Sequence, residues 1–165
     1  MKYLLGLFMN KIIFSLIIMF SSGFLHAEQL RFMLELGNKE NLYLLDAESI
    51  EKSGKLVRVW MKTISNPKYI QSGQASYTMT QWEVNCGARK IQALKKVSYS
   101  SDGNVISSMN QPGDLMSIVP ESRGSEYYKI FCNPKFPNMD ALSKPVDNSD
   151  ELAKTVFKVY GESAK

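Results

Sequence analysis

Six stretches of the chain have the residue pattern of β-strands, and short turns separate them. They are residues 30–36, 41–46, 55–64, 77–86, 90–100 and 105–109. Apolar and polar residues alternate in most of them, as expected of strands that bury one face. Parallel neighbours would need crossover helices that these intervals cannot hold. The sequence therefore predicts a six-stranded antiparallel sheet, with Asp102-Gly103 as a strong hairpin turn.

The third stretch, residues 55–64, has the clearest alternation. Its apolar set is Val57, Val59 and Met61, and its opposite set is Arg58, Trp60 and Lys62. We expect the apolar set in the core. Trp60 then lies between two cations on the polar side, which is typical of a cation–π stack or an exposed binding surface. Either the C-terminal helix covers Trp60, or its indole is the aromatic anchor of an interface.

The first 27 residues have the features of a secretory signal peptide. Lys2 and Lys11 supply the basic region, residues 12–20 are an apolar run, and small residues lead to Ala27. We expect cleavage after Ala27, and an uncleaved N-terminal anchor is the alternative. Met9 can also be the start of translation. No cysteine lies near the cleavage point, so we expect no lipid anchor.

Removal of this segment would change the charge and the available chemistry. The chain has 20 basic and 16 acidic side chains and a net charge of +4, and losing Lys2 and Lys11 without any acid leaves +2. The single histidine, His26, would also be lost. An exported, nearly neutral chain is a poor candidate for nucleic-acid binding. Without histidine it has no His-based triad, general base or metal ligand.

The two cysteines, Cys86 and Cys132, predict a disulfide. An even cysteine count in an exported chain favours a bridge, and the lack of a Cys-x-x-Cys spacing or a histidine argues against a reactive thiol. Closing this loop stabilises the fold by about 4 kcal/mol. Cys86 ends a strand, and Cys132 ends a helix predicted over residues 125–132. The predicted fold is therefore α+β, with this helix packed across the sheet and held by the disulfide.

The prediction divides the chain into a signal peptide (1–27), an α+β domain (28–132) and a C-terminal extension (133–165). Three prolines make residues 133–147 loop-like. A helix then begins at Asn148-Ser149, presents one apolar stripe and ends at Gly161. The stripe is Leu152, Val156, Val159 and Tyr160. This helix either docks on the same domain or binds a partner.

Four basic residues border or occupy the predicted strand 90–100. Strand alternation puts Arg89 and Lys95 on one face and Lys90 and Lys96 on the other. They are either solvated charges that discourage edge-to-edge pairing or a contact for an anionic glycan or lipopolysaccharide.

The sequence has no pattern that identifies an enzyme, a cofactor site or a metal site. Phosphate-binding glycine loops, a nucleophile elbow, a zinc-protease motif and a calcium loop are all absent. Asp46 and Glu48 flank a turn and could form a carboxylate pair, but Asp46 is better explained as a turn or cap residue. We therefore expect no catalytic residue, no metal and no cofactor.

Several segments, in order and spacing, resemble one known family. They are Tyr43-Leu44-Leu45-Asp46-Ala47-Glu48-Ser49-Ile50, Val57-Arg58-Val59-Trp60, Val84-Asn85-Cys86, Pro120-Glu121-Ser122 and Tyr127-Tyr128-Lys129-Ile130-Phe131-Cys132. Over residues 30–132 the chain is similar to the bacterial surface-adhesin protein E family. The resemblance implies a six-stranded antiparallel sheet, a helix tied to it by a disulfide, non-enzymatic adhesion to host matrix and cells, and a possible homodimer.

The expected function is therefore binding to a protein, matrix or envelope ligand, at the cell surface or in the periplasm and without a membrane span in the mature form. The expected ligand surface contains Arg58, Trp60, Lys62, Arg89, Lys90, Lys95 and Lys96. One alternative is a periplasmic adaptor that docks a partner through its C-terminal helix. A more distant alternative is a hydrolase that uses carboxylates alone.

Overall fold

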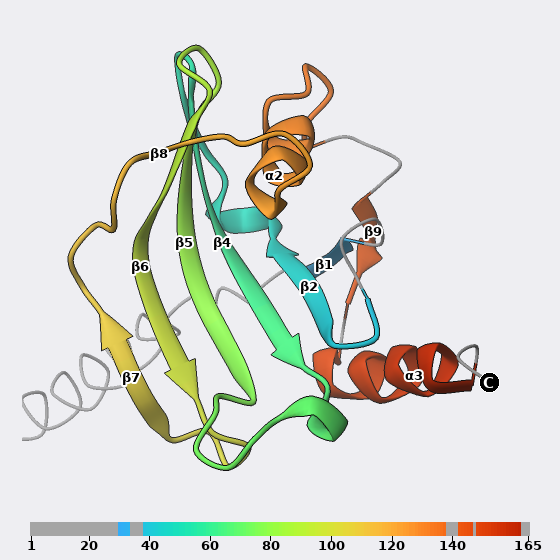
Figure 1. The fold of residues 1–165 in the computed structure, drawn as a ribbon. Helices are drawn as coiled ribbons and strands as arrows, with labels where there is room; N and C mark the ends of the chain where they lie inside the picture. Colours follow the sequence, from blue (N-terminus) through green and yellow to red (C-terminus); the bar gives the residue numbers. More distant parts are fainter. Residues whose placement is uncertain (1–29, 34–37, 138–141, 147, 163–165) are drawn as a thin grey trace, which may run out of the picture.

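An antiparallel sheet forms the body of the molecule in a computed structural model that describes residues 30–33, 38–137, 142–146 and 148–162. Its main strands are β1 (Leu30–Met33), β2 (Asn41–Asp46), β4 (Leu56–Ser65), β5 (Tyr77–Asn85), β6 (Lys90–Tyr99), β7 (Val105–Met109) and β9 (Leu142–Pro145). They lie in the order β7-β6-β5-β4-β2-β1-β9 (Figure 1). Two short strands, β3 (Glu51–Ser53) and β8 (Met116–Ser117), pair with β4 and β6.

The α+β class and all six predicted strands are confirmed where the structure describes them. The predicted first strand is described over Leu30–Met33, and residues 34–37 lie outside the described part, as does the predicted signal peptide. The prediction of a loop over residues 133–147 was wrong for β9, which pairs with β1. Pro145 misled the prediction, because proline is tolerated in an edge strand although it cannot occupy a central one.

Strand alternation gives the sheet two faces with different partners. We call the face that carries Val57, Val59 and Met61 the inner face, and the face that carries Arg58, Trp60 and Lys62 the outer face. All three apolar residues are buried, which confirms the predicted phase of this strand. Adjacent residues of β2 divide in the same way: Leu45 joins the inner cluster and Leu44 the outer one.

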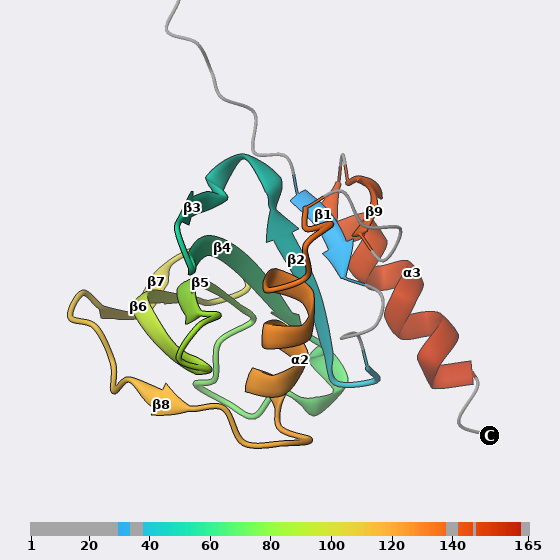
Figure 2. The same cartoon turned by 90° about the horizontal axis from the view of Figure 1, so that it is seen from above.

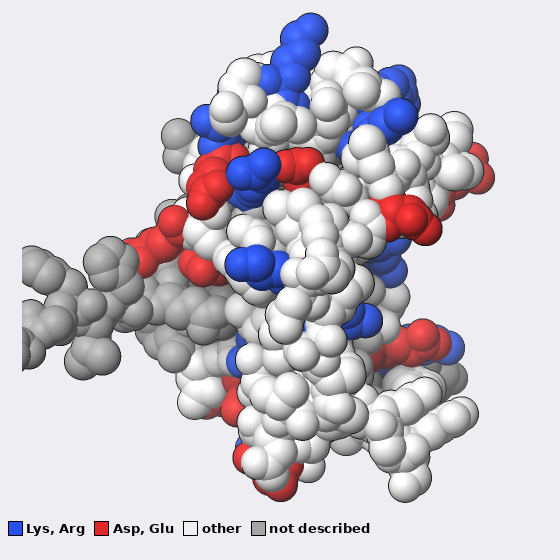
Figure 3. Space-filling model, turned by 90° about the vertical axis from the view of Figure 1, so that its left-hand side faces the viewer, with Lys and Arg blue, Asp and Glu red and all other residues white. Residues whose placement is uncertain are grey.

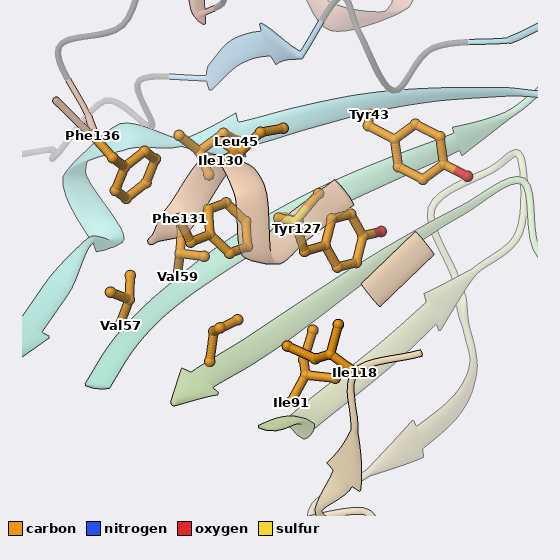
Figure 4. Close-up of a cluster of buried hydrophobic side chains, with 12 residues drawn as sticks. Tyr43, Leu45, Val57, Val59, Ile91, Ile118, Tyr127, Ile130, Phe131 and Phe136 are labelled. Carbon is orange, nitrogen blue, oxygen red and sulfur yellow. The ribbon is translucent and has the colours of Figure 1, made fainter. Parts of the chain in front are cut away.

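Helix α2 (Arg123–Phe131) lies across the inner face (Figure 2). Figure 4 shows its side chains Tyr127, Ile130 and Phe131 pointing toward the apolar side chains of the strands, and all three are buried. Ser122 caps the helix, since its hydroxyl accepts a hydrogen bond from the Ser125 N–H. The predicted helix 125–132 is confirmed, with a start two residues earlier.

The disulfide between Cys86 and Cys132 is also confirmed. It joins the residue after β5 to the residue that caps the C-terminus of α2, and their Cα atoms are 5.5 Å apart. A second link lies beside it, because the Tyr128 hydroxyl donates a hydrogen bond to the Cys86 carbonyl oxygen at 3.2 Å. The end of α2 is therefore fixed to the sheet covalently as well as by packing.

Helix α3 (Ser149–Glu162) packs on the outer face, beside β2 and β4. Its buried Ala153 meets Leu42, Leu44 and Ile64. The predicted cap is confirmed, because the Asn148 side chain accepts hydrogen bonds from the N–H groups of residues 150 and 151.

The predicted stripe of α3 was partly wrong. The side chains that face the sheet are Leu152, Ala153, Val156 and Phe157. Val159 is 56% exposed, the helix continues past Gly161, and the side chain of Tyr160 lies outside the described part. Ala153, Val156 and Phe157 follow Leu152 by one, four and five positions, so all four lie on one side of the helix. The prediction did not include Ala153 and Phe157.

Candidate binding surface on the outer face

The register of the sheet places the predicted surface residues of β4 in rows across the outer face. In an antiparallel pair, directly opposed residues share a face. Arg58 is opposite Glu83, Trp60 is opposite Gln81, and Lys62 is opposite Met79. Gln81 is in turn opposite Lys95 of β6, so that Trp60, Gln81 and Lys95 form a single row, which we call the central row.

Arg58 is held in a polar network at one end of this face. Its Nε donates a hydrogen bond to Glu83 at 2.7 Å, and Gln92 donates to the other carboxylate oxygen at 2.7 Å. Burial by itself would raise the pKa of Glu83, but these two hydrogen bonds outweigh it and lower the pKa below its usual value. Arg58 therefore stabilises a buried carboxylate of its own sheet.

Lys62 is engaged at the opposite end, beside α3. Its Nζ donates to the Ser149 hydroxyl at 2.9 Å and lies 4.8 Å from the centre of the Tyr77 ring. The Tyr77 ring stacks on Tyr99 with their centres 4.6 Å apart. Lys62 thus helps to hold the first turn of α3 against the sheet.

Trp60 lies between these two ends and is half-buried. Its backbone N–H donates to the Ser49 hydroxyl at 2.8 Å, which fixes the strand beside η2 (Ala47–Ser49). The indole is not among the described side chains packed on the apolar cluster beneath α3. Among the described residues, the cations that lie over aromatic rings contact tyrosine and phenylalanine rings and not the Trp60 ring.

The prediction that Lys90 and Lys96 share a face of β6 was wrong. Ala93 pairs with Trp82 and Lys95 pairs with Gln81, so Leu94 forms a bulge without an opposed residue. One extra residue reverses the alternation beyond it. Lys95 consequently shares the outer face with Lys90, whereas Lys96 lies on the inner face, opposite Thr80.

Arg89 does not belong to the strand at all. It lies in the turn before β6 with a backbone φ of +52°, and its guanidinium is 5.1 Å from the centre of the Tyr128 ring. It therefore packs on α2. Lys95 and Lys96 are both exposed, and among the described residues neither they nor Lys90 form an ion pair.

Sequence reasoning missed an apolar groove on the inner side, next to the start of α2. This cavity of about 340 Å³ is lined mainly by Trp82, Ile91, Met116, Val119 and Tyr127. Leu115, Met116 and Val119 are among the exposed large apolar residues of the described chain. Two apolar pairs outside the predicted strands, at 115–116 and 118–119, were the available signal for it.

The titratable groups around the sheet are arranged for structure. Asp46 caps η2 by accepting the Glu48 N–H at 3.1 Å, as predicted, and burial raises its pKa despite that bond. Burial likewise raises the pKa of Tyr43 and of Tyr127. The described residues contain no group of three or more His, Cys, Asp or Glu side chains that could hold a metal ion.

The antiparallel sheet and the helix tied to it by a disulfide agree with the fold that the family resemblance implies. The family model described as surface-adhesin protein E matches residues 32–133. The chain belongs to this family. Membership indicates a binding module of adhesion type, and such proteins are typically non-enzymatic.

The family match covers β1 to α2 and ends at the residue after the second cysteine, so α3 lies beyond it. Neither the curated proteins nor the solved structures contain a significant match. Within the described residues, no helix is long and apolar enough to cross a membrane. Family and disulfide together are consistent with export.

Proposed function

We propose that this protein is an exported, non-enzymatic adhesion module that binds a protein ligand of the host matrix or the bacterial envelope. The central row Trp60, Gln81 and Lys95 on the outer face is the proposed contact surface. One observation carries this proposal: the row combines a half-buried indole, an amide and an exposed lysine that forms no ion pair with any described residue.

The surroundings of the row support this assignment. Arg58 and Lys62 are engaged on either side of it, so they hold the surface rather than contact the ligand. Strands β4, β5 and β6 form the longest pairings of the sheet and give the row a rigid base. Tryptophan at the centre of a rigid surface is a frequent hot spot of protein interfaces.

The alternative adaptor function receives less support. It requires the apolar side of α3 to be available to a partner, but Leu152, Ala153, Val156 and Phe157 pack on the protein's own sheet. Lys62 also donates a hydrogen bond to the first residue of α3. These contacts favour α3 as a structural element of the outer face.

Export is part of the proposal, and the compartment can be tested on intact cells. An adhesin displayed at the surface is cleaved by an added protease, whereas a periplasmic protein is cleaved only after the outer barrier is opened. If the protein is completely protected from the protease on intact cells, its ligand must be an envelope component and a host ligand is excluded.

The ligand surface is tested by binding of the purified oxidised protein to immobilised matrix extract and to immobilised envelope extract. Trp60→Ala and Lys95→Glu should each weaken binding about tenfold or more, because substitution of a hot-spot residue costs about 2 kcal/mol or more. Lys129→Glu reverses the charge of an exposed residue on α2 and is the matched control. Unchanged binding by both outer-face variants, with normal folding, would refute this surface.

A further inference from the structure

Apart from a bulge at its start, the edge strand β7 lacks the features that usually protect the edge of a sheet. Edge strands are commonly very short, charged, interrupted by proline or bent by a bulge. At the opposite edge, β9 contains Lys144 and Pro145. The side strand β8 has two residues, and β3 contains Glu51 and Lys52. Strand β7 reads Val-Ile-Ser-Ser-Met, with no charge and no proline.

Strand β7 is also accessible. Its first four residues are exposed, with Val105 at 59% and Ile106 at 45%. Figure 3 looks onto this side of the molecule and shows a largely uncharged surface over its lower part. In the described structure β6 is its only strand partner, so one row of its backbone N–H and C=O groups points away from the sheet.

A bulge at the start of β7 leaves most of the strand regular. Tyr99 pairs with Val105 and Ser98 with Ser107, so Ile106 has no opposed residue. From Ser107 to Met109 the pairing with β6 is uninterrupted. The backbone at this end is extended and suited to accept another strand.

Two lysines of β6, Lys95 and Lys96, lie near the same end of β7. Lys96 is opposite Met109 and projects on the inner face, and the preceding Lys95 projects on the outer face. Both are exposed, and neither forms an ion pair with a described residue. A strand added beyond β7 would therefore have a lysine close to each of its faces, which favours acidic side chains on that strand.

We propose that β7 accepts an extended acidic segment of the partner protein as an additional strand, with its carboxylates near Lys95 and Lys96. This inference rests on the proposed function and names the chemistry of the partner. Backbone hydrogen bonds along β7 would provide affinity, and the two lysines would provide selectivity for acidic sequences. Lys95 then belongs both to the central row and to this edge.

The test uses fluorescence anisotropy with three blocked ten-residue peptides and the full oxidised protein. One peptide alternates Glu and Val, the second alternates Lys and Val, and the third has the Glu–Val sequence with prolines at alternate valines. Only the first should bind, and Lys95→Glu combined with Lys96→Glu should weaken it at least tenfold. Lys129→Glu should leave it unchanged. Equal binding of all three peptides would overturn the inference.

Two proline variants test the strand addition itself. Consecutive N–H groups of a strand point to opposite edges, so either Ser107→Pro or Ser108→Pro removes an N–H that points away from β6. That variant should keep near-normal thermal stability and lose peptide binding at least tenfold. If both variants unfold, amide hydrogen exchange of the unmodified protein decides, because the bound Glu–Val peptide must slow exchange in residues 105–109. Unaltered exchange there would refute the inference.

The outcomes separate this inference from the proposed function. Matrix or envelope binding that requires Trp60, together with no binding of the Glu–Val peptide, would overturn the β7 inference alone. Peptide binding that requires the β7 edge, together with normal extract binding by Trp60→Ala, would support the edge and overturn the central row. Concentration-dependent self-association that the stable proline variant abolishes, without peptide binding, would assign β7 to a second copy of the chain.

Discussion

A different helix covers each face of the sheet, and only one of these two helices lies within the family match. On the inner face, α2 lies within the family match, contributes Tyr127, Ile130 and Phe131 to a large apolar cluster, and is tied down by the disulfide. On the outer face, α3 lies beyond that match and buries a small cluster through Ala153. The larger apolar cluster therefore lies on the inner face, and the smaller one lies on the outer face.

The largest effect should follow removal of the covalent link on the inner face. Replacing both cysteines, Cys86→Ser with Cys132→Ser, removes a bridge between residues 46 positions apart. The expected loss is about 4 kcal/mol in the free energy of unfolding, measured by urea denaturation. A loss under about 1 kcal/mol would show that packing alone holds α2.

A matched pair in β2 compares the two apolar clusters directly. Leu44 and Leu45 are adjacent and fully buried, but they face α3 and α2 respectively. Each substitution by alanine should cost about 3 kcal/mol. Leu45→Ala should cost more. The disulfide-linked helix α2 cannot close the cavity left by Leu45 as readily as α3 can close the cavity left by Leu44.

The comparison becomes sharper when α3 is displaced. Ala153→Asp puts a charge into the contact between α3 and the sheet. In that background Leu44→Ala should lose most of its effect, whereas Leu45→Ala should keep its own. Equal losses in both backgrounds, by the same urea measurement, would mean that α3 and Leu44 are not energetically coupled.

The helix caps give a smaller contrast. Ser122→Ala and Asn148→Ala each remove a side-chain acceptor at a helix N-terminus, which typically costs about 1 kcal/mol. The Ser122 variant should lower global stability. The Asn148 variant should instead speed amide exchange in α3 while the exchange of β4 and β5 stays unchanged, and faster exchange throughout the sheet would contradict the comparison.

The smallest expected effect is a change in the dependence of stability on pH. The folded-state pKa of Glu83 is lowered, so its stabilisation is present above its usual pKa of about 4.5 and is lost as the pH falls through the folded value. Glu83→Gln should flatten this loss in urea denaturation between about pH 5 and pH 3. Asp46→Asn should instead steepen the loss of stability as the pH falls. Burial raises the pKa of Asp46, so in the unmodified protein this group makes stability fall as the pH rises.

The inner face could be predicted well from the sequence. The alternation of residues 57–61 placed the core residues, and the two cysteines specified how the helix is attached. Both are local signals with strong physical constraints. Strand β9 was not predictable in this way, because its four residues form a strand only through pairing with β1, far away in the sequence.

The candidate surface was predicted less accurately. Residues Arg58, Trp60 and Lys62 were correctly placed on one face. Their contacts with Glu83, Ser49 and Ser149 depend on how other elements pack around β4. Lys95 and Lys96 were correctly predicted on opposite faces, but Lys90 was grouped with Lys96 and not with Lys95, because the bulged residue Leu94 carries no distinctive sequence signal. The unprotected edge at β7 also required the strand order, since sequence alone does not reveal which strand is outermost.

Lysine labelling with and without the immobilised extract tests the central claim most directly, because exposed lysines lie on both sides of the molecule. If the outer face binds the ligand, Lys95 should be protected from acetylation in the bound protein, while Lys129 of α2 and Lys154 of α3 should remain reactive. Protection of Lys129 or Lys154 with full reactivity of Lys95 would contradict the claim.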